Sequence, residues 1–205
     1  MTRTDRQPKA GERMARLIYS AIASLDGYVE DTAGAFDWSA PDDEVHAFVN
    51  DLQRPIGTYL YGRRMYETMT YWETASIDAD RGDPGSDYAR IWRGAEKIVY
   101  SRTLPAPTTA RTRLGRSFDP AAVRRLKQSS TSDLSIGGAA LAGQALAAGL
   151  VDECHVFLGP IAVGGGKPVF PLGVRVRLDL LDEHRFRGGT VCLRYTVLPA
   201  TKGRV

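Results

Sequence analysis

The chain has 205 residues, of which 43% are hydrophobic and 9% aromatic, enough to bury one substantial core. Its 27 basic and 24 acidic residues leave a net charge of +3 with no continuous run of like charge, which does not suggest nucleic acid as a partner. No apolar stretch is long enough to span a membrane, and the polar start has no signal-peptide core. We expect a cytoplasmic protein with a disordered leader over 1–15, one domain over 16–198 and a tail over 199–205.

The order of the predicted elements is that of an α/β protein. Residues 16–25 are nearly all apolar or small, which is typical of a central strand buried on both faces. Strands are then predicted at 57–62, 97–102, 112–114 and 133–137, and helices at 41–52, 63–69, 86–93, 119–127 and 139–146. A polar loop is predicted at 71–85. The last third is mostly strand and ends in an antiparallel pair at 177–185 and 190–198, so we predict a largely parallel sheet with an antiparallel edge.

The two cysteines, Cys154 and Cys192, each lie inside an apolar run that reads as a buried strand. No Cys-x-x-Cys motif or Cys/His cluster accompanies them. We therefore expect reduced core cysteines and no metal site.

A glycine pair connects the predicted strand at 133–137 to the helix that follows. Gly137 and Gly138 precede the small residues Ala139 and Ala140, so backbone N–H groups and the positive end of a helix dipole could meet an anion there. Taken alone, this pattern is also typical of an ordinary strand-to-helix connection. The sequence has neither the P-loop motif nor the G-x-G-x-x-G fingerprint of the Rossmann fold.

Two other strand ends carry cations. Gly62 is followed by Arg63 and Arg64 at a helix start, where arginine opposes the helix dipole, so an anionic group is expected nearby. Ser101 and Arg102 end the next strand, where ligands of open α/β sheets gather.

The segment after the first strand has two possible roles. Residues 28–39 include Asp37 and Trp38 and could form a lid over a cleft or an ordinary surface loop anchored by its aromatic side chains. The acids Asp43 and Glu44 could point into the cleft or could only favour the start of the helix. His46 follows them, and we expect an ordinary helix residue there.

Six motifs follow one another in a characteristic order. They are S-L-D-G at 24–27, Y-G-R-R-M-Y-E at 61–67, V-Y-S-R-T-L at 99–104, S-I-G-G-A-A-L-A-x-Q-A-L at 135–146, L-V-D-E at 150–153 and V-G-G-G-K-P-V-F-P at 163–171. This set resembles the dihydrofolate reductase superfamily over about 16–197. More narrowly, it resembles stand-alone domains related to the C-terminal reductase of the bacterial bifunctional deaminase-reductase of riboflavin biosynthesis.

The resemblance implies a three-layer α/β/α fold with an eight-stranded, mostly parallel sheet and NADPH across the carboxyl ends of its strands. Gly137, Gly138, Ala139 and Ala140 would contact the pyrophosphate, Gly62, Arg63 and Arg64 the other phosphates, and Ser101 and Arg102 the 2′-phosphate. Ala21, Ile22 and Ala23 would lie against the nicotinamide, with the loop containing Asp37 and Trp38 closing over the substrate.

The implied reaction is hydride transfer from NADPH to a small heterocycle, pyrimidine or pterin-like, with Asp26, Asp43 or Glu44 as proton donor. An ungapped match to the folate enzyme puts His46 at its pterin-binding carboxylate, whereas small gaps put Glu44 or Asp43 there. Two alternatives remain: a regulatory module that binds NADPH without turnover, and an RNA-binding domain. Relatives in this superfamily are commonly dimers, so we expect a homodimer.

Overall fold

The computed structural model of the chain describes residues 14–77 and 82–199. The predicted leader up to residue 13, residues 78–81 of the predicted polar loop, and residues 200–205 of the tail lie outside the described residues. Ala15, which the sequence assigns to the leader, is instead buried, and its backbone N–H donates to the carbonyl of Lys127 at 3.0 Å. The folded domain therefore begins before Arg16.

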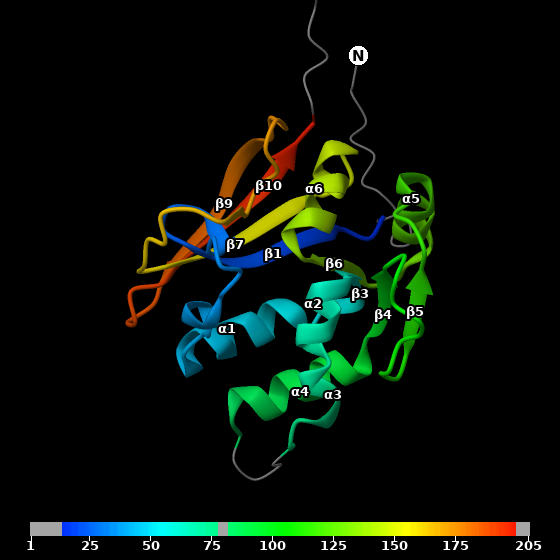
Figure 1. Cartoon of the computed structure of the whole chain (residues 1–205), viewed down its shortest axis with the longest axis horizontal. Helices are drawn as coiled ribbons and strands as arrows, with labels where there is room; N and C mark the ends of the chain where they lie inside the picture. The colour runs from blue at the N-terminus through cyan, green and yellow to red at the C-terminus, as the bar shows by residue number, and fades with distance from the viewer. Residues whose placement is uncertain (1–13, 78–81, 200–205) are drawn as a thin grey trace, which may run out of the picture.

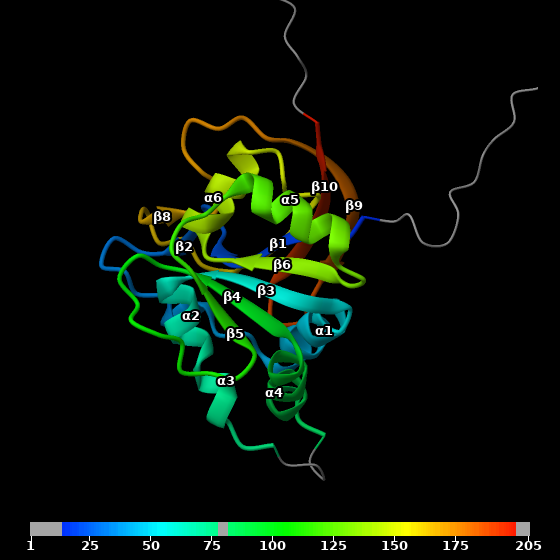
Figure 2. The same ribbon diagram turned by 90° about the vertical axis from the view of Figure 1, so that its right-hand side faces the viewer.

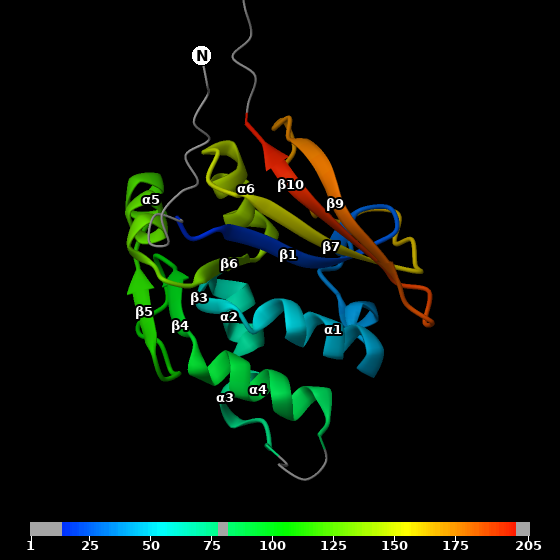
Figure 3. The same cartoon turned by 180° about the vertical axis from the view of Figure 1, so that it is seen from behind.

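An eight-stranded sheet forms the centre of the molecule (Figure 1). Its strands, in spatial order, are β5 (Thr112–Gly115), β4 (Glu96–Tyr100), β3 (Ile56–Gly62), β6 (Asp133–Gly137), β1 (Leu17–Ser24), β7 (Glu153–Gly159), β10 (Val191–Leu198) and β9 (Arg177–Arg185). The first six are parallel to one another, and β10 is antiparallel to both β7 and β9. Figure 3 shows the β9–β10 pair at the outer edge. The predicted parallel sheet with an antiparallel C-terminal edge is confirmed.

Helices cover both faces of the sheet, so the fold has the three layers that the resemblance implies (Figure 2). One face carries α1 (Asp43–Gln53), α2 (Arg63–Met69), α3 (Tyr71–Thr74) and α4 (Pro84–Gly94), and the other carries α5 (Pro120–Ser129) and α6 (Ala139–Ala147). Within residues 14–77 and 82–199, no helix is long and apolar enough to cross a membrane.

The structure corrects two predicted boundaries beside α4. Residues 71–74 are helical as α3, although the sequence predicts a loop there. Helix α4 begins two residues earlier than predicted because the side chain of Asp83 accepts from the Ser86 N–H at 2.9 Å and Pro84 occupies the first turn.

Part of the predicted loop at 28–39 is regular structure. Strand β2 (Tyr28–Glu30) pairs with β8 (Lys167–Pro168), and Asp37–Ser39 form a short 3-10 helix, η1. Gly166 makes this small sheet possible, because its φ is +135° and a Cβ there would collide with the Glu30 carbonyl. The chain after β1 is thereby fastened against the loop after β7.

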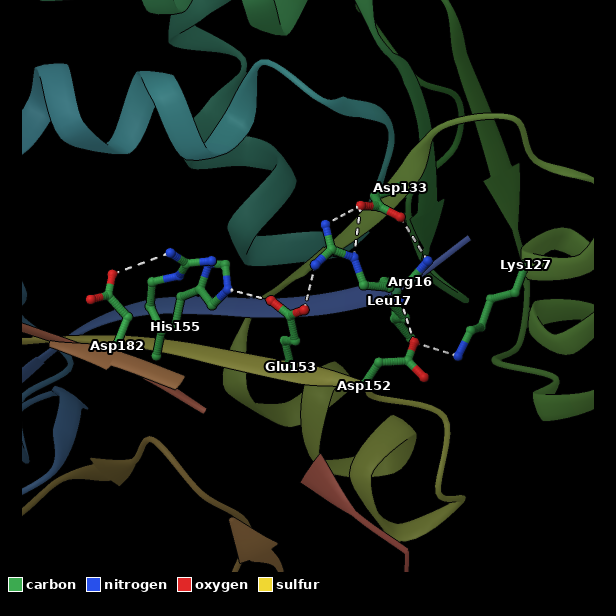
Figure 4. A network of polar contacts seen from close by, with 9 residues as sticks. Arg16, Leu17, Lys127, Asp133, Asp152, Glu153, His155 and Asp182 are labelled. Atoms are coloured by element: carbon green, nitrogen blue, oxygen red, sulfur yellow. Dashed lines mark hydrogen bonds and ion pairs between the residues drawn. The ribbon is translucent and has the colours of Figure 1, made fainter. Parts of the chain in front are cut away.

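Charged side chains gather at the amino ends of the central strands, at the edge opposite the strand ends that the sequence singles out (Figure 4). Arg16 binds both Asp133, which begins β6, and Glu153, which begins β7. The Glu153 carboxylate also lies 3.0 Å from Nε2 of His155, whose side chain is buried. This network joins β1, β6 and β7 where the polypeptide enters the sheet.

Candidate active site

A cavity of about 480 Å³ lies between the sheet and the helices α1 to α4. Its floor consists of small side chains on the two central strands: Ser20 of β1, and Ser135 and Gly137 of β6. Large aromatic side chains of the flanking strands project on either side of these small residues. Because Tyr59 and Tyr61 of β3 pair in register with Ser135 and Gly137, small and large residues stand side by side on one face. This alternation leaves the space that a ligand could fill.

The glycine pair after β6 lies at one end of the cavity. Gly138 has a φ of +91°, and a Cβ there would lie 3.3 Å from the Met65 Cβ and 4.0 Å from the Gly62 backbone nitrogen. Two of the motifs predicted to meet phosphate are therefore direct neighbours. Gly62 also pairs in register with Tyr100, the last residue of β4, so the carboxyl ends of β3, β4 and β6 converge as expected.

The arginines of these motifs differ in their partners. Arg63 forms a 2.7 Å ion pair with Glu67 and donates to the Thr103 hydroxyl at 2.8 Å. Arg64 pairs with Glu30 of β2 at 3.1 Å. The anionic groups expected near the arginines of α2 therefore include two carboxylates of the protein itself, those of Glu67 and Glu30. Arg102 is exposed, and its guanidinium forms no ion pair or hydrogen bond within the described residues.

The remaining predicted cofactor residues are divided between the cavity and its surroundings. Ala21, Ile22 and Ala139 line the cavity, and Ala140 lines an adjoining shallow groove. Ala23 is fully buried in the core cluster that includes residues of α6. Ser101 is also buried, and its hydroxyl accepts from the backbone N–H groups of Thr103 and Leu104, at 3.3 and 3.0 Å. Its side chain therefore holds the turn after β4.

Of the two loop residues predicted to contact substrate, only one lines the cavity. Asp37, exposed on η1, lines the cavity. Trp38 does not line it, and its buried indole nitrogen has no hydrogen-bond partner within the described part of the chain.

The three predicted proton donors lie outside the cavity lining, which corrects the expectation that one of Asp43 and Glu44 points into the cleft. The side chain of Asp42 caps α1 by accepting from the Val45 N–H at 2.9 Å, so Asp43 and Glu44 occupy its exposed first turn. Glu44 accepts from the backbone N–H of Arg187 at 3.1 Å.

Asp26 has a structural role at the end of β1. It accepts from the backbone N–H groups of Val163 and Gly164, at 3.1 and 2.7 Å. Hydrogen bonds from Ser24 and from these groups lower the pKa of Asp26. The carboxylate therefore fastens the loop after β7, including the triple-glycine segment.

Sequence reasoning missed the part of the cavity that is lined by α1, α3 and α4. His46, Val49 and Gln53 line it at the spacing of one helix face, and Trp72 and Tyr88 close it. Burial lowers the pKa of His46, and burial raises the pKa of both Tyr59 and Tyr61 well above the ordinary value of 10. The i, i+3, i+7 spacing in α1 is visible in the sequence, but a helix face that packs on a sheet has the same spacing.

Comparison with solved structures supports the fold. A putative riboflavin biosynthesis protein from Shewanella sp. PV-4 superposes with a TM-score of 0.66 at 20% identity, covering 90% of this chain and 99% of the other. RibD from Acinetobacter baumannii superposes with a TM-score of 0.67 at 16% identity, and the match covers 90% of this chain and 58% of that longer protein.

Comparison of sequences identifies the family. The chain is 26% identical over 185 residues to the protein YyaP of Bacillus subtilis (strain 168), covering 89% of this chain and 95% of YyaP. The family model of the RibD C-terminal domain matches residues 15–192, which include all the strand ends described above. The chain therefore belongs to the family of RibD C-terminal domains.

Proposed function

We propose that the protein is an NADPH-dependent reductase that transfers a hydride to a small heterocycle of the pyrimidine or pterin type. The observation that carries this proposal is the convergence of three strand ends on one end of the cavity. The motifs that the resemblance assigns to phosphates are neighbours there. Gly138 lies beside the Gly62 nitrogen, and Gly62 pairs in register with Tyr100. Family membership supports the same class of activity.

The groups present at this end fit a dinucleotide phosphate. Helix α6 begins at Ala139, directly after a glycine with positive φ. The N–H groups of Ala139 and Ala140 have no intrahelical partners, whereas those of Leu141 and Ala142 donate to the Gly138 carbonyl. Arg102 has no anionic partner within the described residues and suits the dianionic 2′-phosphate. A side chain in place of Gly138 would press on Met65 and narrow the approach to these donors.

The chain's own residues would hold the reacting rings together. When bound, NADPH would supply the hydride. Ala21 and Ile22 of β1 line the cavity, and a flat ring could lie against this strand. Phe157 and the tyrosines of β3 flank this surface and exclude water, which favours a fixed alignment of two rings.

The proton would be held at the rim of the cavity. Asp37 and Glu30 are the two carboxylates that line it within the described residues. Glu30 is engaged by Arg64 and Lys167, at 3.1 and 3.4 Å. We therefore assign to Asp37 the role of carrying a proton between solvent and the substrate.

One observation favours a second candidate function. Asp26, Asp43 and Glu44 all lie outside the cavity lining. A regulatory module that binds NADPH without turnover would need none of these three acids at the cavity. Its signature would be NADPH binding with no oxidation of the cofactor by any substrate.

The test is to measure NADPH binding by calorimetry and then to follow its oxidation by absorbance with a panel of substrates. The panel holds dihydrofolate, a phosphoribosylated aminopyrimidine, an uncharged dihydropterin and simple quinones. Binding with turnover supports the reductase, and binding without turnover supports the regulatory module. If the protein binds single-stranded RNA with a steep salt dependence and does not bind NADPH, both proposals are wrong.

We also propose that the protein is a homodimer. Strand β9 is the edge of the sheet and exposes Leu180 and Leu181, each about half accessible. Apolar side chains on an edge strand favour pairing with another chain. Light scattering on the purified protein measures the mass directly.

A further inference from the structure

Five rings that line the cavity form a group that we call the aromatic chamber: His46, Tyr59, Tyr61, Trp72 and Tyr88, of which Tyr61 lies directly beside Gly137. The rings of Tyr59 and Tyr61 stack with an interplanar angle of 7° and centroids 5.5 Å apart. Trp72 packs edge-on against Tyr88 at 4.8 Å, and His46 contacts both of these rings, at 5.6 and 5.7 Å. Four separate elements, α1, β3, α3 and α4, supply these side chains, so the chamber is a product of the tertiary fold.

Two buried polar atoms at the cavity have hydrogen-bonding capacity to spare. Oε1 of Gln53 has no hydrogen bond within the described residues, and the hydroxyl of Tyr59 faces that of Tyr88 without a hydrogen bond of good geometry. Both residues line the cavity, and the exposed fractions of Gln53 and Tyr59 are only 6% and 1%. Buried polar groups are nearly always paired in folded proteins. A ligand that donates to Gln53 and shares a hydrogen bond with Tyr59 would satisfy both.

The aromatic chamber carries no charge at neutral pH. Burial raises the pKa of Tyr59, Tyr61 and Tyr88, which keeps all three phenols protonated. Burial also outweighs the carboxylates of Asp43, Asp83 and Asp87 in lowering the pKa of His46, so the imidazole is neutral. A charged ligand group placed here would lose its hydration without gaining a counter-charge.

The cations at the rest of the cavity are already paired. Arg64 and Lys167 line it, and both contact the Glu30 carboxylate. Asp37 adds a second negative charge at the rim. With two cations and two carboxylates, the ionisable side chains of the described lining carry no net positive charge to attract a phosphate on the substrate, in contrast to Arg102 at the strand ends.

We infer that the substrate is an uncharged, flat lactam heterocycle, a ring with adjacent N–H and C=O groups, that carries no phosphate. Its faces would lie among the rings of the aromatic chamber, and its polar edge would meet Gln53 and Tyr59. This inference rests on the proposed function and narrows it, because it predicts that the protein prefers a bare pyrimidine or pterin ring to a phosphoribosylated pyrimidine.

The experiment compares 5,6-diaminouracil with the same ring carrying a phosphoribosyl group on the 6-amino nitrogen. Binding is measured by calorimetry and by quenching of tryptophan fluorescence, since Trp72 lies in the aromatic chamber. We expect the bare ring to bind at least tenfold more tightly. Tyr59→Phe and Gln53→Met should each weaken it about tenfold, whereas Tyr195→Phe on β10, outside the cavity lining, should leave it unchanged.

Tighter binding of the phosphoribosylated ring, no binding of the bare ring, or unchanged binding in both Tyr59→Phe and Gln53→Met would overturn the inference. NADPH binding, measured separately, distinguishes this failure from that of the proposed function. Turnover of a phosphoribosylated substrate alone contradicts only the inference. Absence of NADPH binding, with the bare ring still bound, contradicts only the reductase proposal.

Discussion

Arg64 at the start of α2 donates to Glu30 of β2 at 3.1 Å, and this ion pair joins segments 34 residues apart in sequence. Lys167 of β8 contacts the same carboxylate at 3.4 Å. Glu30 therefore connects the small β2–β8 sheet to the helix that follows β3. It also shares its single negative charge between two cations at the cavity.

Replacing Glu30 by Gln should change what the cavity accepts more than it changes stability. The Arg64 side chain is 64% exposed and that of Lys167 is 35% exposed, so losing both ion pairs should alter the free energy of unfolding by only about 1–2 kcal/mol. Arg64 and Lys167 would then be available to a phosphate, and we expect the preference for the bare diaminouracil to fall severalfold. Glu183→Gln on the exposed strand β9 is the control and should not change the ratio of affinities.

Arg102→Ala should separate the two nicotinamide cofactors. A charge-assisted hydrogen bond to the 2′-phosphate is worth about 1.5–3 kcal/mol, so the affinity for NADPH should fall about 10- to 100-fold while that for NADH is unchanged. Calorimetric titration of both cofactors measures this, with the exposed Arg90→Ala on α4 as the matched control. An equal loss for NADPH and NADH would show that Arg102 does not contact the 2′-phosphate.

Gly138→Ala should reduce both stability and cofactor binding. The residue has a φ of +91°, and its new Cβ would lie 3.3 Å from the Cβ of Met65, so we expect about 1–3 kcal/mol of destabilisation in urea unfolding. NADPH affinity should also fall, because the turn before α6 would shift. Gly94→Ala is the control: it has open space around its Cβ and a negative φ, and it should be neutral or stabilising. Unchanged NADPH affinity in a folded Gly138→Ala variant would argue against a pyrophosphate site at this turn.

The carboxylates near the cavity should differ sharply in their effect on turnover. Asp43→Asn and Glu44→Gln should leave kcat within about twofold, because neither side chain lines the cavity. Asp37→Asn should lower kcat about 100-fold if it carries the proton. The readout is kcat against pH with the best substrate of the panel. A normal kcat for Asp37→Asn, together with a large loss for Glu44→Gln, would reverse the assignment.

His155 should make the protein less stable in mild acid. Burial lowers the pKa of His155 below its ordinary value of 6.5, although the hydrogen bond to Glu153 opposes this, and Arg194 and Arg16 nearby also lower it. Because the folded state resists protonation, unfolding takes up a proton as the pH falls. The contribution of His155 to the free energy of unfolding should therefore be fully present above pH 6.5 and decline as the pH falls below 6.5, by at most about 1.4 kcal/mol per pH unit for one group.

Urea unfolding at several pH values measures this decline. His155→Gln should make it shallower, and His184→Gln on the exposed strand β9 should not. His46 also has a lowered pKa, so part of the decline should remain in His155→Gln. An identical slope in wild type and His155→Gln would rule out the contribution of His155.

The order of strands and helices along the chain could be predicted well because it depends on local pattern. Apolar runs such as β1 and β6 identify buried strands, and Gly62 and Gly138 mark where helices begin. The roles of the acids could not be predicted in this way. Asp43 and Glu44 lie at a helix start whether they face a cleft or solvent, and only the position of α1 on the sheet decides between the two.

The sequence by itself determined the α/β architecture, the resemblance to a reductase family, and the three strand ends with glycines and cations. These features are properties of short segments and of their order. Only the tertiary structure decided that Glu30 neutralises Arg64, that Ser20 and Ser135 form a low floor, and that Gln53 and Tyr59 meet the same cavity. Each of these depends on side chains from distant segments, and their contacts are set by the packing of whole elements.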